Sequence, residues 1–126
     1  MTNNQIRGTQ GENAASDFLL AKGYKIIARN YRYKRAEIDI IAQLDNLLVF
    51  AEVKWRRSDN FGFPEEAVSE RKRELFLEAA EHYIEETGWQ HDLRFDIIAI
   101  TKNNSGQYLY HIEDAFHWGQ PPLSPP

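Results

Sequence analysis

The chain contains no cysteine among its 126 residues, which excludes a disulfide framework and any metal site built on thiolate ligands. Its histidines show neither HxH nor HExxH spacing, so a zinc site is not expected. The sequence also lacks a glycine-rich phosphate loop, a dinucleotide fingerprint and a GxSxG nucleophile elbow. Nothing in the sequence therefore supports a zinc enzyme, a nucleotide-binding fold or a serine hydrolase.

Long apolar segments are absent as well. No run approaches the roughly 20 residues needed to cross a bilayer, and the opening MTNNQIRGTQ lacks the apolar core of a signal peptide. We therefore expect a cytoplasmic protein with no membrane partner. The length suits one domain with a modest core. We assign residues 1–118 to that domain and the proline-rich residues 119–126 to a disordered tail.

Basic residues are in the minority, 15 against 19 acidic residues, which gives a net charge of −4. Their distribution is uneven, because residues 1–57 carry a net charge of +4 and residues 58–126 a net charge of −8. The basic excess lies in ARNYRYKR (28–35) and KWRR (54–57). Such clusters can create a local positive field on an acidic protein. Ordinary solvated side chains are the alternative explanation.

Hydrophobic periodicity predicts helices alternating with strands. Apolar residues at helical spacing, followed by Gly23 as a C-terminal cap, predict a helix over 11–23. Ser69 is the expected N-cap of a long helix that reaches about Glu86 and ends at Thr87-Gly88. Strands are expected at 24–33, 37–44, 47–55, 93–101 and 107–112, and a last helical turn at 113–118.

This order of elements predicts an α/β fold with a mixed central sheet of about five strands flanked by helices. Asp45 and Asn46 suit a tight turn, so the strands on either side are expected to form an antiparallel hairpin. The long helix then acts as a crossover, which makes the next strand parallel to the last strand of that hairpin.

The hairpin carries charges within apolar strands. Side chains alternate along a strand, so EIDII is expected to present Asp39 on the face opposite Ile38 and Ile40. In VFAEVKWR, Glu52 and Lys54 are two residues apart and share a face. Asp39 and Glu52 lie at similar distances from the turn, so the two acids and the lysine are expected to converge.

Two converging carboxylates repel each other and need a proton, a basic partner or a cation. Oxygen ligands suit Mg²⁺ or Mn²⁺. With an ammonium group beside the metal, such a site can bind a phosphate, activate a water and stabilise the charge that develops during phosphodiester hydrolysis. The alternative is a simple ion pair between Glu52 and Lys54 on a solvated strand face.

An Asp, a hairpin and then Glu-x-Lys resemble the signature of the PD-(D/E)XK nuclease superfamily, which has the restriction-endonuclease-like fold. The segments GENAASDFLLAKGYKIIARNYR, AEIDIIA, LLVFAEVKWR, FGFPEEAVSERKRELFLEAAEHYI, RFDIIAI and HIEDAF together resemble the YraN-like family. Its members are small bacterial proteins predicted to be endonucleases and similar to archaeal Holliday junction resolvases. The resemblance covers roughly residues 8–118.

The resemblance implies an α/β/α core and a nuclease that hydrolyses DNA with Mg²⁺ or Mn²⁺, including branched, repair or recombination intermediates, as a homodimer. It implies that Asp39 and Glu52 bind the metal together with the backbone carbonyl of Val53. Lys54 matches the catalytic lysine, and Glu12 matches a helix glutamate that joins the site and the metal. One departure is Ala36, which stands where the family usually has glycine ahead of Glu-Ile-Asp.

Several basic residues are candidates for contact with nucleic acid, namely Arg56, Arg57, Arg32, Lys34, Arg35 and Lys72. For Lys72, a solvated helix face is the competing interpretation, and Glu37 is a secondary site candidate that shares the face of Asp39. Two other functions stay open. One is a non-catalytic nucleic-acid-binding module of the same fold, and the other is a globular protein whose charges form a buried ion-pair network.

Overall fold

The computed structural model describes the chain over residues 3–57 and 69–115. Within those ranges, side chains are described for 8–55, 69–102 and 104–115. The predicted tail at 119–126 lies outside the described residues, so the division into a domain and a tail stays a prediction.

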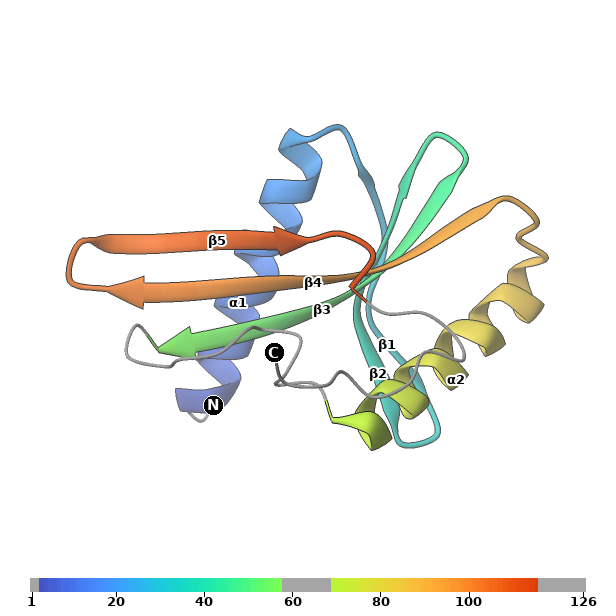
Figure 1. The fold of residues 1–126 in the computed structure, drawn as a ribbon, viewed down its shortest axis with the longest axis horizontal. Helices are drawn as coiled ribbons and strands as arrows, with labels where there is room; N and C mark the ends of the chain where they lie inside the picture. Colours follow the sequence, from blue (N-terminus) through green and yellow to red (C-terminus); the bar gives the residue numbers. More distant parts are fainter. Residues whose placement is uncertain (1–2, 58–68, 116–126) are drawn as a thin grey trace, which may run out of the picture.

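Helices and strands follow the predicted order. They are α1 (Asn3–Ala21), β1 (Lys25–Tyr33), β2 (Ala36–Leu44), β3 (Leu47–Arg57), α2 (Glu70–Thr87), β4 (Asp92–Asn103) and β5 (Gly106–Ile112). The strands form one sheet in the order β1-β2-β3-β4-β5 (Figure 1). Only β3 and β4 pair in parallel, while the other three pairs are antiparallel. The mixed five-stranded α/β fold is therefore confirmed.

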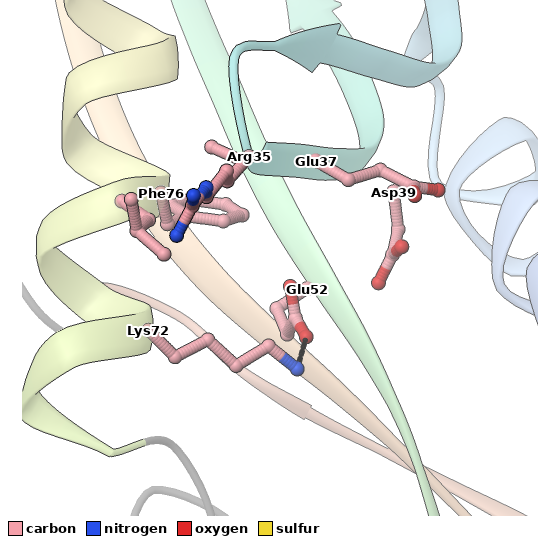
Figure 2. Close-up of a pocket in the computed structure, with 8 residues that line it drawn as sticks. Arg35, Glu37, Asp39, Glu52, Lys72 and Phe76 are labelled. Carbon is pink, nitrogen blue, oxygen red and sulfur yellow. Dashed lines mark ion pairs between the residues drawn. The ribbon is translucent and has the colours of Figure 1, made fainter.

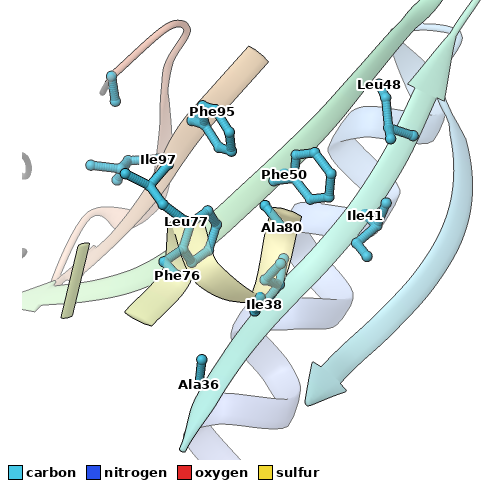
Figure 3. Packing of buried hydrophobic residues seen from close by; sticks show 12 residues of the cluster. Ala36, Ile38, Ile41, Leu48, Phe50, Phe76, Leu77, Ala80, Phe95 and Ile97 are labelled. Carbon is cyan, nitrogen blue, oxygen red and sulfur yellow. The ribbon is translucent and has the colours of Figure 1, made fainter. Parts of the chain in front are cut away.

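One helix covers each face of the sheet, which gives three layers (Figure 1). The cluster on the α2 side contains Phe50, Phe76 and Phe95, together with Ile38 and Ile41 (Figure 3). The cluster on the α1 side is formed by buried residues of α1 and of the three central strands, including Ala15, Leu19, Ile40, Ala42, Val49, Ala51 and Ile98. Burying apolar side chains on both faces stabilises a sheet whose central strands are almost continuously hydrophobic.

The helix ends confirm the predicted caps. The hydroxyl of Ser69 accepts a hydrogen bond from the backbone N–H of Lys72 at 3.1 Å. Gly88 follows α2 with φ 70° and Gly23 follows α1 with φ 94°, the left-handed conformation that favours glycine. The helix α1 begins at Asn3, eight residues before its predicted start. Its first turns have no apolar stripe, so periodicity did not detect them.

The predicted last helical turn is wrong for the part that the structure describes. Glu113 and Asp114 form a turn, in which Asp114 has φ 55°. Ala115 is buried, and its N–H donates to the Phe95 carbonyl at 2.7 Å. This bond holds the chain after β5 against the sheet in place of a helical turn.

Alternation along β2 is interrupted at Asp39, contrary to expectation. Ile38 packs with Ile41 on the α2 side, whereas Ile40 packs on the α1 side. In the described sheet, β1 pairs on either side of Asp39, but the position opposite it, Asn30, has φ 55° and is not paired. A non-glycine residue with φ above zero is uncommon, and Asn30 marks an irregularity in β1 at this position. The side chains of β2 therefore change faces at Asp39, which is the candidate acid.

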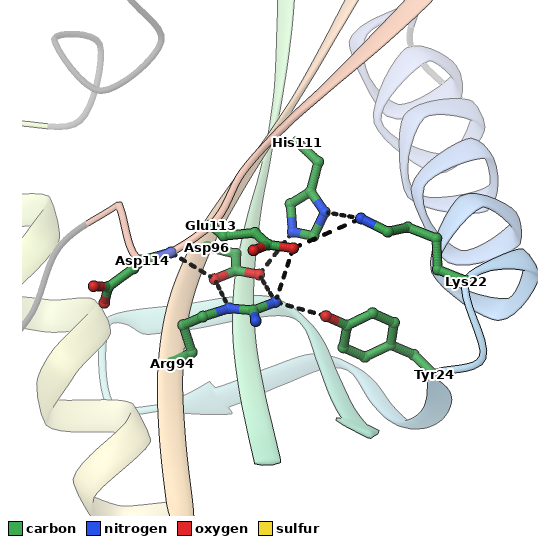
Figure 4. Close-up of polar contacts among 7 residues, drawn as sticks. All are labelled: Lys22, Tyr24, Arg94, Asp96, His111, Glu113 and Asp114. Carbon is green, nitrogen blue, oxygen red and sulfur yellow. Dashed lines mark hydrogen bonds and ion pairs between the residues drawn. The ribbon is translucent and has the colours of Figure 1, made fainter. Parts of the chain in front are cut away.

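A buried polar cluster joins β4 to β5 and to the end of α1 (Figure 4). The carboxylate of Asp96 is fully buried and accepts two hydrogen bonds from the Arg94 guanidinium, both at 2.8 Å. His111 Nε2 lies 2.7 Å from the same carboxylate, and Arg94 also donates to the hydroxyl of Tyr24 at 2.6 Å. Burial alone would raise the pKa of Asp96, but these hydrogen bonds lower it overall. The cluster is a structural support for the sheet.

Gly11 brings α1 close to the residue after Lys54. A Cβ atom on Gly11 would lie 2.5 Å from Nε1 of Trp55, so Gly11→Ala must displace the indole ring. We expect this substitution to lower the free energy of unfolding by about 1–3 kcal/mol, measured by urea denaturation. Gly8→Ala in the same helix is the matched control, because nothing lies within 4 Å of its Cβ position. Equal stability of the two variants would contradict close packing at Gly11.

Candidate functional site

The site lies where β2 and β3 separate. Their ladder runs from Leu44↔Leu47 to Ile40↔Ala51, and the next two residues are Asp39 and Glu52. Beyond this point the two strands diverge (Figure 1). There the carboxylate of Asp39 accepts a hydrogen bond from the backbone N–H of Val53 at 2.8 Å. The Asp39 side chain thus takes the place of a ladder partner for the Val53 N–H. This hydrogen bond holds Asp39 beside Glu52.

Glu52 is a buried carboxylate with two ammonium partners. It is 4 % exposed, and its Oε1 lies 3.4 Å from Nζ of Lys54 and 2.6 Å from Nζ of Lys72. Lys54 is on the same strand, whereas Lys72 reaches the site from the first turn of α2. A buried charge is costly unless it is paired. The two lysines supply that pairing.

A cavity of about 240 Å³ opens in front of these acids. Figure 2 shows Asp39, Glu52 and Lys72 directed into it from β2, β3 and α2. The full lining consists of Arg35, Ala36, Glu37, Asp39, Glu52, Lys72, Leu75 and Phe76. The lining thus combines three acids and Lys72 with apolar side chains and a single arginine. The cavity gives a ligand direct access to the charged groups.

Burial and neighbouring charges shift the pKa values of the site's side chains. Burial and the neighbouring Glu52 raise the pKa of Asp39 to about 7, although the Val53 N–H opposes the shift. Burial, together with the adjacent Lys72, lowers the pKa of Lys54. Burial would also lower the pKa of Lys72, but the Glu52 carboxylate outweighs it and raises that pKa. Asp39 therefore gains a proton more readily than an exposed aspartate, and Lys54 loses one more readily than an exposed lysine.

Glu12 is near this group but is not part of a ready-made cluster. Its pKa is raised mainly by burial, and its charge contributes to the raised pKa of Asp39. Its nearest cation is Arg29, at 4.0 Å, and its Oε1 accepts no hydrogen bond within the described residues. Across the described ranges, no three acidic or histidine side chains are gathered as a metal cluster. The structure thus brings Asp39, Glu52 and Lys54 together and leaves Glu12 at their margin.

The predicted nucleic-acid contacts are distributed unevenly around the cavity. Arg35 lines it, whereas Lys34 is exposed and pairs with Glu78 at 3.6 Å. Arg32 is exposed and pairs with Glu37 at 3.2 Å. That pair follows from the strand register, in which Arg32 is opposite Glu37. The backbone of Arg56 and Arg57 belongs to β3, but their side chains lie outside the described residues.

The position of Lys72 in the structure is closer to the candidate acids than its sequence pattern indicated. A solvated helix face was the competing explanation, yet its ammonium group contacts the buried Glu52. A signal was present in the sequence. Lys72 stands four residues before Phe76, which is a buried residue of α2. Side chains four residues apart share a helix face, so Lys72 belongs to the edge of the sheet-facing side.

The fold and the site define a three-layer α/β protein with a cluster of carboxylates and lysines where the β2–β3 ladder ends. Comparison with known proteins identifies its family. The family model of the "Uncharacterised protein family UPF0102" matches residues 11–100, and the chain belongs to this family. The YraN-like resemblance of the sequence is thereby confirmed at the level of the family.

The relatives cover almost the whole chain. A UPF0102 protein of Christiangramia forsetii is 44 % identical over 111 residues, which is 88 % of this chain and 93 % of the relative. A UPF0102 protein of Natranaerobius thermophilus is 43 % identical over 118 residues, which is 90 % of this chain and 99 % of the relative. Neither α1 nor α2 is long and apolar enough to span a membrane.

Proposed function

We propose that this protein is a metal-dependent endonuclease of the PD-(D/E)XK class that hydrolyses phosphodiester bonds in DNA. The observation that carries the proposal is the convergence of Asp39, Glu52 and Lys54, of which the two acids line one cavity. These residues come from two strands that separate at this point, which leaves space for a ligand between the acids. The family resemblance of the sequence assigns the same three residues to metal binding and catalysis.

The donor set fits Mg²⁺ or Mn²⁺. Mg²⁺ is typically held by one or two carboxylates, with waters and substrate phosphate oxygens completing its octahedron. Asp39 and Glu52 supply two carboxylates, and the Val53 carbonyl is the further ligand that the family resemblance implies. The raised pKa of Asp39 supports the assignment, because two acids that repel each other are stabilised by a divalent cation. Glu12 would act through bound water, since it is not gathered with the two acids.

Each side chain has a defined task in hydrolysis. A bound metal would neutralise charge on the phosphate and lower the pKa of a water. Lys54 lies beside Glu52, where its ammonium group stabilises the negative charge that develops on the phosphorane oxygens. Its lowered pKa suits proton exchange with the attacking water. Lys72 and Arg35 line the approach and bind the phosphates on either side.

The proposal is tested by measuring cleavage and metal binding with the purified protein. Duplex, nicked, single-stranded and branched DNA are incubated with Mn²⁺, and we expect cleavage of at least one substrate that a chelator abolishes. Glu52→Gln removes a ligand at similar volume and is expected to abolish both cleavage and calorimetric Mn²⁺ binding. DNA binding without any metal binding at millimolar Mn²⁺ would contradict the nuclease and favour a non-catalytic binding module.

A further inference from the structure

The sheet face that carries Lys54 continues across β4 to two tyrosines on β5. Lys54 is paired with Ala99, and Ala99 is paired with Tyr110. Paired residues of neighbouring strands point to the same face, and Tyr108 joins them because it is two residues before Tyr110. Leu109, between the two tyrosines, packs against the α1-side cluster, which confirms the alternation. Both rings therefore lie on the catalytic face of the sheet.

These tyrosines are the most exposed of the large apolar side chains in the described ranges. Tyr108 is 54 % exposed and Tyr110 is 64 % exposed. Neither stacks on another ring within the part of the chain that is described. Figure 1 shows the β4–β5 hairpin extending away from α2, which covers the opposite end of this face. Two aromatic rings are thus presented to solvent beside a site already assigned to phosphate.

The spacing suits a nucleic acid strand with unpaired bases. Neighbouring strands are about 4.8 Å apart, so Tyr110 lies about 10 Å from Lys54 across the sheet. The two tyrosines are about 7 Å apart along β5. Aromatic rings beside a cationic phosphate site form the arrangement on which exposed bases stack in single-strand binding. A base-paired duplex keeps its bases stacked on each other and offers no free face to these rings.

We propose that Tyr108 and Tyr110 form a stacking platform for unpaired nucleobases next to the scissile phosphate. The inference rests on the proposed function and narrows its substrate to DNA with a single-stranded segment, such as a flap, a gap or a branch. Continuity with Lys54 favours a nucleic acid over a second copy of the chain. A second copy would pair through the free edge of β5 and would not require the rings on this face.

The test compares binding to oligonucleotides with and without bases. Fluorescence anisotropy at low salt, with a chelator to prevent cleavage, measures the affinity for a 20-mer of thymidine and for an abasic 20-mer. We expect the wild type to bind the thymidine oligonucleotide at least about tenfold more tightly. The double substitution Tyr108→Ala and Tyr110→Ala should remove that preference, whereas the double phenylalanine variant should keep it. Leu20→Ala is the matched control, because Leu20 is 53 % exposed on α1.

Several outcomes would overturn the platform. One is equal affinity of the wild type for both oligonucleotides. Another is a base preference that survives in the double alanine variant. A third is a wild-type dimer, detected by sedimentation, that the double alanine variant converts to a monomer while its base preference is unchanged. Photocrosslinking of an iodouracil oligonucleotide to the wild type, mapped by mass spectrometry, gives a result that does not depend on the variants folding. Crosslinks confined to other residues would also refute the platform. Mn²⁺-dependent cleavage without base preference would refute the platform and leave the proposed nuclease function intact. Base preference without cleavage would refute the nuclease function and leave the platform intact.

Discussion

Replacing Lys54 by alanine is expected to lower the rate of Mn²⁺-dependent DNA cleavage by about 10²–10³-fold. The ammonium group lies 3.4 Å from Glu52, and under the proposed function it would stabilise charge on a phosphate bound there. Removing a cation does not remove an oxygen ligand, so metal affinity should be unchanged or somewhat higher. Single-turnover cleavage and calorimetric Mn²⁺ titration of the same preparations measure the two quantities separately.

Two further variants define what Lys54 does. Lys25→Ala removes an exposed lysine at the start of β1 and should leave the rate unchanged. Lys54→Arg keeps the positive charge but cannot exchange a proton near neutral pH. A partial rescue by arginine would assign charge stabilisation to Lys54, and no rescue would assign proton transfer or exact geometry. Cleavage by Lys54→Ala at the wild-type rate would contradict the role altogether.

The sequence predicted the fold well because its signals were local. Alternating and helical apolar patterns located every strand and both helices, and Ser69 and Gly88 marked the ends of α2 by ordinary capping chemistry. The start of α1 was missed, since its first turns are polar and carry no periodicity. A helix without an apolar stripe leaves no pattern to detect.

The site was predicted in its members but not in its geometry. Asp39, Glu52 and Lys54 were expected to converge from the hairpin register, and the structure places them together. The interruption of β2 at Asp39 was not predictable, because it coincides with an irregular pairing with β1, in which the opposite residue Asn30 is left-handed. Pairing between Lys72 and Glu52 depends on how α2 crosses the sheet, which is a tertiary property. Spacing along α2 could place Lys72 on the side that faces the sheet, but it could not identify Glu52 as its partner.

The same geometry means that the ionised Asp39 side chain lowers the free energy of unfolding when no metal is bound. Its folded pKa is about 7, against an ordinary value of 3.8, so the folded state binds the proton more tightly than the unfolded state. The stability that this proton contributes is fully present below about pH 4 and is lost as the pH rises through about 7. Asp39→Asn removes the titrating charge at the same volume. It should therefore stabilise the protein at pH 8 by up to about 4 kcal/mol, since the folded pKa lies about three units above 3.8 and each unit corresponds to about 1.4 kcal/mol.

Urea denaturation at several pH values, in a chelator, measures this difference between Asp39→Asn and the wild type. The gain should shrink toward zero near pH 4, where both forms are uncharged at this position. Mn²⁺ should reverse the order at pH 8, because it binds and stabilises the folded wild type but has lost a ligand in the variant. Asp17→Asn is the control, since Asp17 is exposed on α1 and its replacement should change stability by less than about 0.5 kcal/mol. A variant that is less stable than the wild type at pH 8 without metal would show that Asp39 has a structural role. The expected pattern is stabilisation together with loss of cleavage. It would show that the repulsion between Asp39 and Glu52 serves metal binding at the expense of stability.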